Sequence, residues 1–250
     1  MSKRRRDRNV LGNVGLAVLA AGTIGVVASA FVSADSKAPT ATQVQSYYES
    51  HTAVPTPTVD TRPLAVFVGD SYAQGRGASG PATQWVTLVS KRMGWGHVNL
   101  GRGGTGYVST ADASGCGLSF CANFQEMTEY GLNSQKPAIF VVSGGQNDFD
   151  DFMKDPSTVT AAIHKTYKSI RDRLPEAKIV AVGPSTPWTI GPDVRGLDRV
   201  VQDAAVKAGA TYVSLIEPNV IEKRMVGPDG AHVTDEGHAA IAERVASALR

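Results

Sequence analysis

Short apolar segments alternate with longer amphipathic segments from residue 64 to the end of the chain. Five apolar segments have the length of buried β-strands: 64–68, 97–100, 138–142, 178–182 and 211–215. Five segments are predicted helices: 81–93, 121–132, 157–174, 194–208 and 238–249. Because apolar strands that alternate with helices form a parallel sheet covered on both faces, the pattern predicts an α/β fold with a doubly wound, five-stranded parallel sheet.

Polar or glycine-rich turns follow the first three predicted strands. Ser71 stands in the segment VFVGDSYAQG, just past the first strand, and the turns 101–104 and 144–148 follow the second and third. Ligands of doubly wound sheets bind beyond the carboxyl ends of the strands, where the strand order reverses. The three turns are therefore expected to converge at one edge of the sheet. A serine at such a position is either ordinary turn chemistry or a nucleophile.

A nucleophilic serine needs a base within hydrogen-bond reach, and the chain has five histidines. His232 is the candidate, because Asp229 precedes it by three residues in PDGAHVTDEGH. From a turn, this carboxylate can bind Nδ1 of the imidazole and leave Nε2 facing the serine. His238 begins the last predicted helix, where it is expected to pack or cap.

An ester under attack develops an oxyanion, which needs fixed hydrogen-bond donors. The same turns offer three candidates. They are the backbone N–H of Gly104 in VNLGRGGTG, the side-chain amide of Asn147 in GGQND, and the N–H of Ser71 itself. The spacing supplies candidates for a serine hydrolase site and does not by itself assign their roles.

Four short blocks resemble those of the SGNH, or GDSL-type, hydrolases. They are Gly69-Asp70-Ser71, Gly104 in NLGRGGTG, Asn147 in GGQND, and Asp229-Gly230-Ala231-His232, and they stand in the family's order within residues 64–250. The resemblance implies a three-layer α/β/α sandwich of flavodoxin-like type and ester hydrolysis without a metal or cofactor. It implies Ser71 as nucleophile, His232 as base and Asp229 as the orienting acid. Ser71, Gly104 and Asn147 would supply the oxyanion donors.

Two residues depart from the family pattern. Tyr72 follows the serine where the family commonly has leucine, and Val233 follows His232 where proline is frequent. Other site types fit less well. The G-x-S-x-G elbow of ordinary α/β-hydrolases is absent. The acidic residues near His232 lack the H-E-x-x-H pattern of a zinc site, and GRGGTG lacks the G-K-[ST] ending of a phosphate loop.

The net positive charge of the chain comes from its N-terminus. Residues 1–9 carry five basic side chains and one acidic one, so a chain of net charge +2 leaves −2 on the other 241 residues. A nucleic-acid-binding body is therefore not expected. The uncharged stretch 9–34 is long enough to cross a bilayer, and the positive charge before it predicts export of the remaining chain. The stretch is either a membrane anchor through residues 10–32 or a signal peptide that ends at Val32-Ser33-Ala34.

The expected domains are an N-terminal anchor or signal peptide (1–34), a linker rich in threonine, proline and alanine (35–62), and the hydrolase domain (63–250). Cys116 and Cys121 are the only cysteines. Export predicts a disulfide between them, with two free core cysteines as the alternative. A zinc site is disfavoured, because no second Cys or His pair lies nearby.

Substrate choice is left to loops that the four blocks do not cover. Tyr72, Tyr107 and Trp188 are candidates to contact a sugar or an acyl chain, with plain packing as the alternative. The predicted function is an exported or membrane-anchored serine esterase acting on acyl groups of lipids, glycans or small esters. An acyltransferase with the same triad, or a non-catalytic glycan-binding domain, is the alternative. The sequence favours no particular oligomeric state.

Overall fold

The computed structural model describes residues 60–250. The predicted N-terminal segment 1–34, and the predicted linker up to residue 59, lie outside these residues. Among residues 60–250, no helix is both long enough and apolar enough to cross a membrane. The division into anchor, linker and catalytic domain therefore stays a prediction.

The described residues form one five-stranded sheet in which all neighbouring strands are parallel. Its strands are β1 (Leu64–Gly69), β2 (Gly96–Asn99), β3 (Ile139–Ser143), β4 (Lys178–Val182) and β5 (Thr211–Val213). The order across the sheet is β2-β1-β3-β4-β5. This is the flavodoxin-like order, so the predicted fold class is confirmed.

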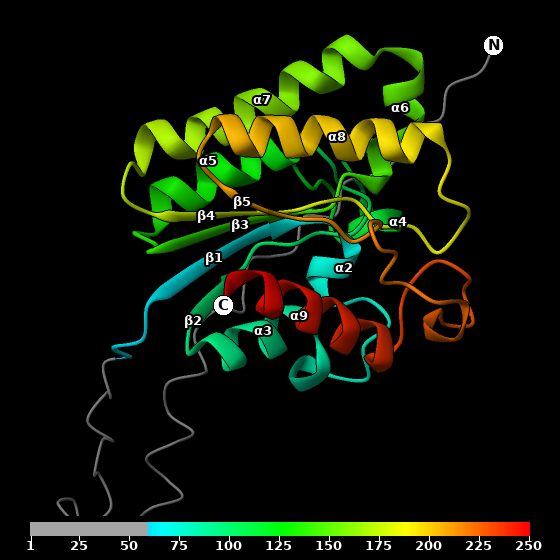
Figure 1. The fold of residues 1–250 in the computed structure, drawn as a ribbon, viewed down its shortest axis with the longest axis horizontal. Helices are drawn as coiled ribbons and strands as arrows, with labels where there is room; N and C mark the ends of the chain where they lie inside the picture. The colour runs from blue at the N-terminus through cyan, green and yellow to red at the C-terminus, as the bar shows by residue number, and fades with distance from the viewer. Residues whose placement is uncertain (1–59) are drawn as a thin grey trace, which may run out of the picture. The chain divides into compact units, whose positions relative to one another are not determined.

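Helices cover both faces of this sheet (Figure 1). The α-helices are α2 (Ser71–Gln74), α3 (Trp85–Met93), α4 (Ala113–Cys116), α5 (Phe124–Ser134), α6 (Phe149–Lys154), α7 (Pro156–Arg173), α8 (Pro192–Lys207) and α9 (Asp235–Leu249). Short 3₁₀ turns are η2 (Pro81–Thr83), η3 (Gln146–Asp148) and η4 (Lys223–Met225). Helices α3 and α9 lie on one face, and α5, α7 and α8 lie on the other, which gives three layers.

The alternation of side chains along β1 builds a core on each face. Ala65 and Phe67 pack with residues of α3 and α9, whereas Val66 and Val68 pack with residues of α5, α7 and α8. All four side chains are 0–1% exposed. Since successive strand residues point to opposite faces, a strand buried on both sides must be apolar throughout, as the sequence pattern of β1 required.

Helix boundaries differ from the predicted ones where capping residues intervene. The predicted helix 81–93 is divided at Gln84, whose extended backbone separates η2 from α3. The predicted helix 121–132 begins only at Phe124, because the side chain of Asn123 accepts from the N–H of Glu126 in a capping box. Helices α2, α4 and α6, of four to six residues, are too short to produce a periodic signal.

The strand order reverses at β1, which pairs with β2 on one side and β3 on the other. Gly69 at the end of β1 lies opposite Ser143 at the end of β3. A Cβ atom on Gly69 would lie 2.6 Å from both the Cβ of Ala73 and the backbone oxygen of Ser143. Glycine is therefore needed for the chain to turn sharply into α2 against the neighbouring strand.

Truncating the core on the α7 face tests this packing. Ile163→Ala is expected to lower the free energy of unfolding by about 2–5 kcal/mol, because the smaller side chain leaves a cavity in the space that the fully buried isoleucine filled. Lys165→Ala on the exposed side of the same helix is the control and is expected to change stability by less than about 0.5 kcal/mol. Urea denaturation followed by circular dichroism measures both, and equal effects of the two substitutions would contradict the packing described.

Candidate active site

Ser71 is held at the tip of β1 by the start of a short helix. Asp70 caps α2 through its Oδ1 atom, which accepts from the N–H of Tyr72 at 2.9 Å. The N–H of Gln74 donates to the backbone oxygen of Asp70 at 2.8 Å. The segment Gly-Asp-Ser thus fixes the backbone of Ser71, whose side chain is 6% exposed.

Asp229 and His232 form a tight local pair in the loop before α9. Nδ1 of His232 lies 2.6 Å from Oδ2 of Asp229, while Oδ1 of Asp229 accepts from the backbone N–H groups of His232 and Ala231 at 2.9 and 3.0 Å. The backbone N–H and the imidazole of His232 hold the pKa of the Asp229 carboxyl well below its usual range. An ionised carboxylate at Nδ1 fixes the imidazole tautomer that carries its proton there and leaves Nε2 as the acceptor.

Tyr72 connects the serine turn to the histidine loop. Its hydroxyl donates to the backbone oxygen of Ala231 at 2.8 Å, and its ring centroid lies 6.2 Å from that of His232. The phenol is 4% exposed. Tyr72, which stands where leucine is common in the family, therefore bonds to the loop that holds His232.

The side chain of Asn147 is oriented by a hydrogen bond to the loop that follows β2. One N–H of its side-chain amide donates to the backbone oxygen of Thr105 at 2.9 Å, which leaves the second N–H for another acceptor. The adjacent Asp148 is fully buried and accepts from Ser109 Oγ and from the backbone N–H groups of residues 107, 108 and 109. Burial raises the pKa of Asp148, and these donors oppose the rise. The carboxylate thus joins η3 to the loop that follows β2.

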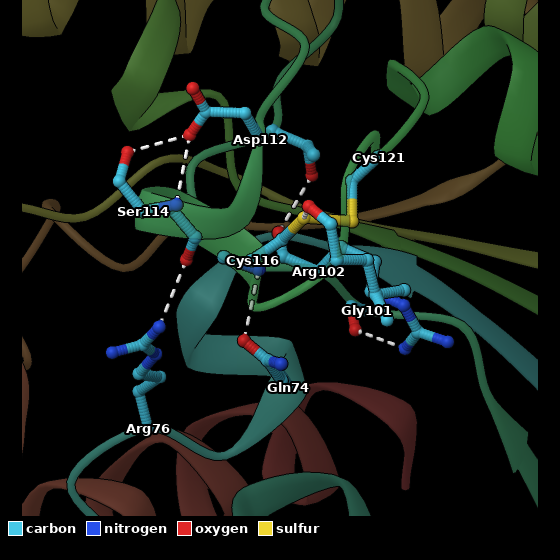
Figure 2. Close-up of a disulfide and its surroundings, with 12 residues drawn as sticks. Gln74, Arg76, Gly101, Arg102, Asp112, Ser114, Cys116 and Cys121 are labelled. Carbon is cyan, nitrogen blue, oxygen red and sulfur yellow. Dashed lines mark hydrogen bonds between the residues drawn. A yellow bond between two sulfur atoms is a disulfide. The ribbon is translucent and has the colours of Figure 1, made fainter. Parts of the chain in front are cut away.

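Gly104 lies against the disulfide loop, residues 111–121. Its φ of 75° is in the left-handed region that favours glycine, and a Cβ there would lie 3.1 Å from the Cβ of Ala111. Cys116 and Cys121 form the predicted disulfide, and Cys121 exchanges both backbone hydrogen bonds with Ala111. Figure 2 shows Gln74 and Arg76 reaching toward this region, where Gln74 accepts from the N–H of residue 103 and Arg76 donates to the oxygen of residue 115.

These segments enclose a cavity of about 280 Å³ at the carboxyl edge of the sheet. It is lined by Ser71, Arg76, Gly104, Ser114, Gly115, Gln146, Asn147, Ser185, Pro187, Trp188, Ala231 and His232. The structure therefore brings the predicted nucleophile, the predicted base and the predicted oxyanion donors to one hollow. Asp229 lies behind His232, to whose imidazole it is bonded.

A family model for GDSL-like lipases and acylhydrolases matches residues 67–240, which is more than half of the chain. The chain belongs to the GDSL-like lipase/acylhydrolase family. This GDSL-like hydrolase is an enzyme of the ester-hydrolase class, as the sequence predicted. It is 28% identical over 203 residues to a GDSL lipase of Mycobacterium tuberculosis, a match that covers 76% of this chain and 83% of the relative.

Solved structures of lower identity share the fold. TesA is 22% identical, with a TM-score of 0.61 over 75% of this chain and 98% of its own. A family two carbohydrate esterase from Cellvibrio japonicus is 18% identical, with a TM-score of 0.58 over 75% of this chain and 60% of its own. A salicylyl-acyltransferase from a tetracycline biosynthetic pathway is 20% identical, with a TM-score of 0.55 over 76% and 55%. At these identities the likeness concerns the fold alone.

The three aromatic residues predicted to contact substrate have different positions. Trp188 lines the cavity and is 64% exposed. Tyr107 is 1% exposed and packs edge-on against Phe124, with its hydroxyl bonded to Tyr167, so the structure does not bring it to the cavity. Tyr72 also does not line the cavity, because its ring packs behind the histidine loop. Packing, the alternative considered for these tyrosines, describes both.

Several cavity residues were not predicted from the sequence. Gln146 and Ser185 follow β3 and β4, so their position after strand ends was the available signal. The sequence carries no such signal for Arg76 and Ser114, because only the fold brings the α2 segment next to the disulfide loop. His238 is buried as expected, and its Nε2–H donates to the backbone oxygen of Arg76 at 3.0 Å.

No group of three or more His, Cys, Asp or Glu side chains suited to a metal ion lies within residues 60–250. The nearest approach to such chemistry at the cavity is the Asp229–His232 pair, whose two contacting atoms are bonded to each other. The expectation of a site without metal or cofactor stays a prediction.

Asp70 is expected to make stability depend on pH. It is 1% exposed, its Oδ2 atom has no hydrogen-bond partner within residues 60–250, and burial raises the pKa of its carboxyl to about 7. The unfolded chain then loses this proton near pH 4 and the folded protein near pH 7. Between these values the unfolded state binds fewer protons, so the contribution of Asp70 to stability falls as pH rises.

Asp70→Asn removes this titration. The unfolding free energy of the variant relative to the wild type is expected to rise by on the order of 3 kcal/mol between pH 4 and pH 7. Urea unfolding at several pH values measures the difference, and Asp150→Asn, on an exposed residue of α6, is the control. A difference between Asp70→Asn and wild type that is constant with pH would refute this role for the buried carboxyl.

The disulfide is expected to support catalysis through Gly104. The double substitution Cys116→Ser, Cys121→Ser frees a short loop, which costs about 2 kcal/mol in the chain-entropy model and loosens the wall behind Gly104. We expect a severalfold lower kcat/KM for p-nitrophenyl acetate. Dithiothreitol should lower wild-type activity to the same level and leave the double variant unchanged. Full activity of the reduced wild type would show that the loop keeps its position without the bond.

Proposed function

We propose that this GDSL-like hydrolase cleaves carboxylic esters with Ser71 as nucleophile, His232 as general base and Asp229 as the carboxylate that orients the imidazole. One observation carries the proposal. Ser71 and His232 line the same cavity, with Nδ1 of His232 bound to Asp229 and Nε2 without a hydrogen-bond partner among the described residues. This leaves Nε2 available for the serine hydroxyl.

The reaction follows from these positions. Ser71 Oγ attacks the ester carbon as its proton passes to Nε2 of His232, and the carbonyl oxygen becomes an oxyanion. The N–H groups of Ser71 and Gly104 and the free N–H of the Asn147 amide are the donors for this oxyanion. The imidazolium then protonates the departing alcohol, which leaves the acyl group esterified to Ser71 Oγ. A water molecule that gives its proton to His232 attacks this ester, and the imidazolium returns the proton to Ser71 Oγ as the acid is released.

Water is proposed as the final acceptor of the acyl group. The side chain of His232 is 23% exposed, so water reaches the imidazole that must activate it. The acyltransferase alternative requires a sugar hydroxyl to displace this water. Product analysis with and without added sugar separates the two, because transfer would yield a new ester and hydrolysis the free acid.

The catalytic domain is proposed to work outside the cytoplasm. The basic residues 1–9, followed by the uncharged stretch 9–34, support export with either a retained anchor or a cleaved signal peptide. The proposed substrates are ester-bearing lipids, glycans or small molecules that this compartment contains.

Substitution of the proposed triad tests the mechanism. Ser71→Ala is expected to abolish turnover of p-nitrophenyl acetate, and His232→Ala to lower kcat by several orders of magnitude. Asn147→Ala should lower kcat by about 10²–10³, the usual loss for one oxyanion donor. A fluorophosphonate should label the wild type and not Ser71→Ala. The matched control is Ser134→Ala on an exposed position of α5. Labelling or turnover that persists in Ser71→Ala would exclude this serine as the nucleophile.

A further inference from the structure

The lining of the catalytic cavity is poorly suited to a long acyl chain. Among its twelve residues no Leu, Ile, Val, Met or Phe occurs. Its only apolar side chains are those of Trp188, Pro187 and Ala231. Its volume of about 280 Å³ is slightly below the roughly 300–1,000 Å³ of small-molecule pockets. A site of this size accommodates a short acyl group and requires a larger alcohol to extend outside it.

A second hollow adjoins the catalytic cavity. It has a volume of about 400 Å³ and shares Gly104, Ser114 and Gly115 with the first. Its other lining residues are Thr110, Ala111, Asp112 and Phe120. Since these three residues line both hollows, the two hollows adjoin at the disulfide loop.

Each hollow has one large aromatic side chain open to solvent. Trp188 is 64% exposed in the first and Phe120 is 61% exposed in the second. The turn that carries Trp188 is fixed, because its backbone N–H donates to Oγ1 of Thr186, a residue that is itself 2% exposed. Flat rings held open at a substrate cavity provide apolar platforms for planar or ring-shaped ligands.

The remaining lining side chains are hydrogen-bonding groups. Arg76 uses one guanidinium N–H on the backbone oxygen of Gly115, and no ion pair of its guanidinium occurs within residues 60–250. Gln146 accepts from Ser185 through Oε1, which leaves its two N–H donors free of that contact. The Ser114 hydroxyl donates to Oδ1 of Asp112, and its oxygen can accept from a ligand. Such groups match an alcohol that carries several hydroxyls.

We infer that the alcohol part of the substrate is an oligosaccharide that carries short acyl groups. One sugar ring packs on Trp188 beside Ser71, and a further ring lies in the second hollow against Phe120. The apolar face of a sugar ring suits an aromatic platform, and its equatorial hydroxyls suit the amide, guanidinium and hydroxyl groups around it. This substrate class rests on the proposed esterase function, and it assigns Trp188 and Phe120 as specificity-determining residues.

Deacetylation of defined sugars tests the inference with the full chain. The substrates are partly O-acetylated xylotetraose and cellotetraose, the corresponding acetylated monosaccharides, and p-nitrophenyl acetate and palmitate. The wild type is expected to release acetate from at least one tetrasaccharide and to turn over p-nitrophenyl acetate well and the palmitate ester poorly. Trp188→Ala should raise KM for that tetrasaccharide roughly threefold to tenfold, the loss of one aromatic contact, with kcat unchanged.

Matched variants distinguish the loss of an aromatic contact with the sugar from a general loss of activity. Phe120→Ala should raise KM for the tetrasaccharide and leave KM for the acetylated monosaccharide unchanged, because the second hollow binds only the longer substrate. Tyr130→Ala on α5, whose ring is 63% exposed and lines neither hollow, should change neither. Tyr130→Ala should also keep the wild-type kcat/KM for p-nitrophenyl acetate.

The outcomes distinguish this inference from the proposed function. If p-nitrophenyl acetate is hydrolysed but no acetylated tetrasaccharide is, or if the palmitate ester is preferred, the oligosaccharide assignment is wrong and the esterase stands. If Trp188→Ala lowers kcat/KM equally for all the esters, the role of Trp188 is structural. Failure of the wild type on every ester would instead refute the esterase mechanism itself.

Discussion

Parallel pairing of β1 with both β2 and β3 positions the functional segments of this GDSL-like hydrolase. Because the three strands are parallel, the turns after β1, β2 and β3 leave the sheet at the same edge, and the strand order reverses there at β1. The alignment of Gly69 with Ser143 sets the distance between the serine turn and the turn that carries Asn147. The N–H of Arg102 donates to the oxygen of Gly69 and ties the third turn to the same point. A change in this register would separate the groups of the proposed mechanism.

Two buried carboxylates lie directly behind the site and are accommodated differently. Asp148 receives four hydrogen bonds and joins the turns that carry Asn147 and Gly104. The carboxylate of Asp70 accepts one hydrogen bond, from the backbone N–H of Tyr72, and its Oδ2 atom has no partner among residues 60–250. Burial of a charged group without compensation is unfavourable, so the proton is retained by Asp70 to a higher pH. Both residues act on the position of neighbouring backbone, and neither of them lines the cavity.

The segment around α2 serves both the chemistry and the substrate wall. Ser71 begins the helix, whereas Gln74 and Arg76, at and just beyond its end, bond to the loop segments around Gly104 and the disulfide. His238 in α9 accepts from the N–H of Trp85 and donates to the oxygen of Arg76, so the far end of the segment is anchored in the layer formed by α3 and α9. Substrate preference can therefore change through the disulfide loop and the Trp188 turn without moving the nucleophile.

The sequence by itself determined the fold class, the five strands and the order of the family's four blocks. These depend on local pattern: apolar runs of strand length, and short motifs whose backbone needs, as at Gly69 and Gly104, are encoded in adjacent residues. The Asp229–His232 pair was also predictable, because its contact spans only three residues. The sequence left Tyr107 between substrate contact and packing, since an aromatic residue next to a catalytic turn has the same sequence signature whether it faces the core or the cavity. Only the tertiary structure decided that Tyr72 supports the histidine loop, that Trp188 is open to solvent, and that Arg76 reaches the disulfide loop. Each depends on packing between segments distant in the chain, and no local periodicity records it.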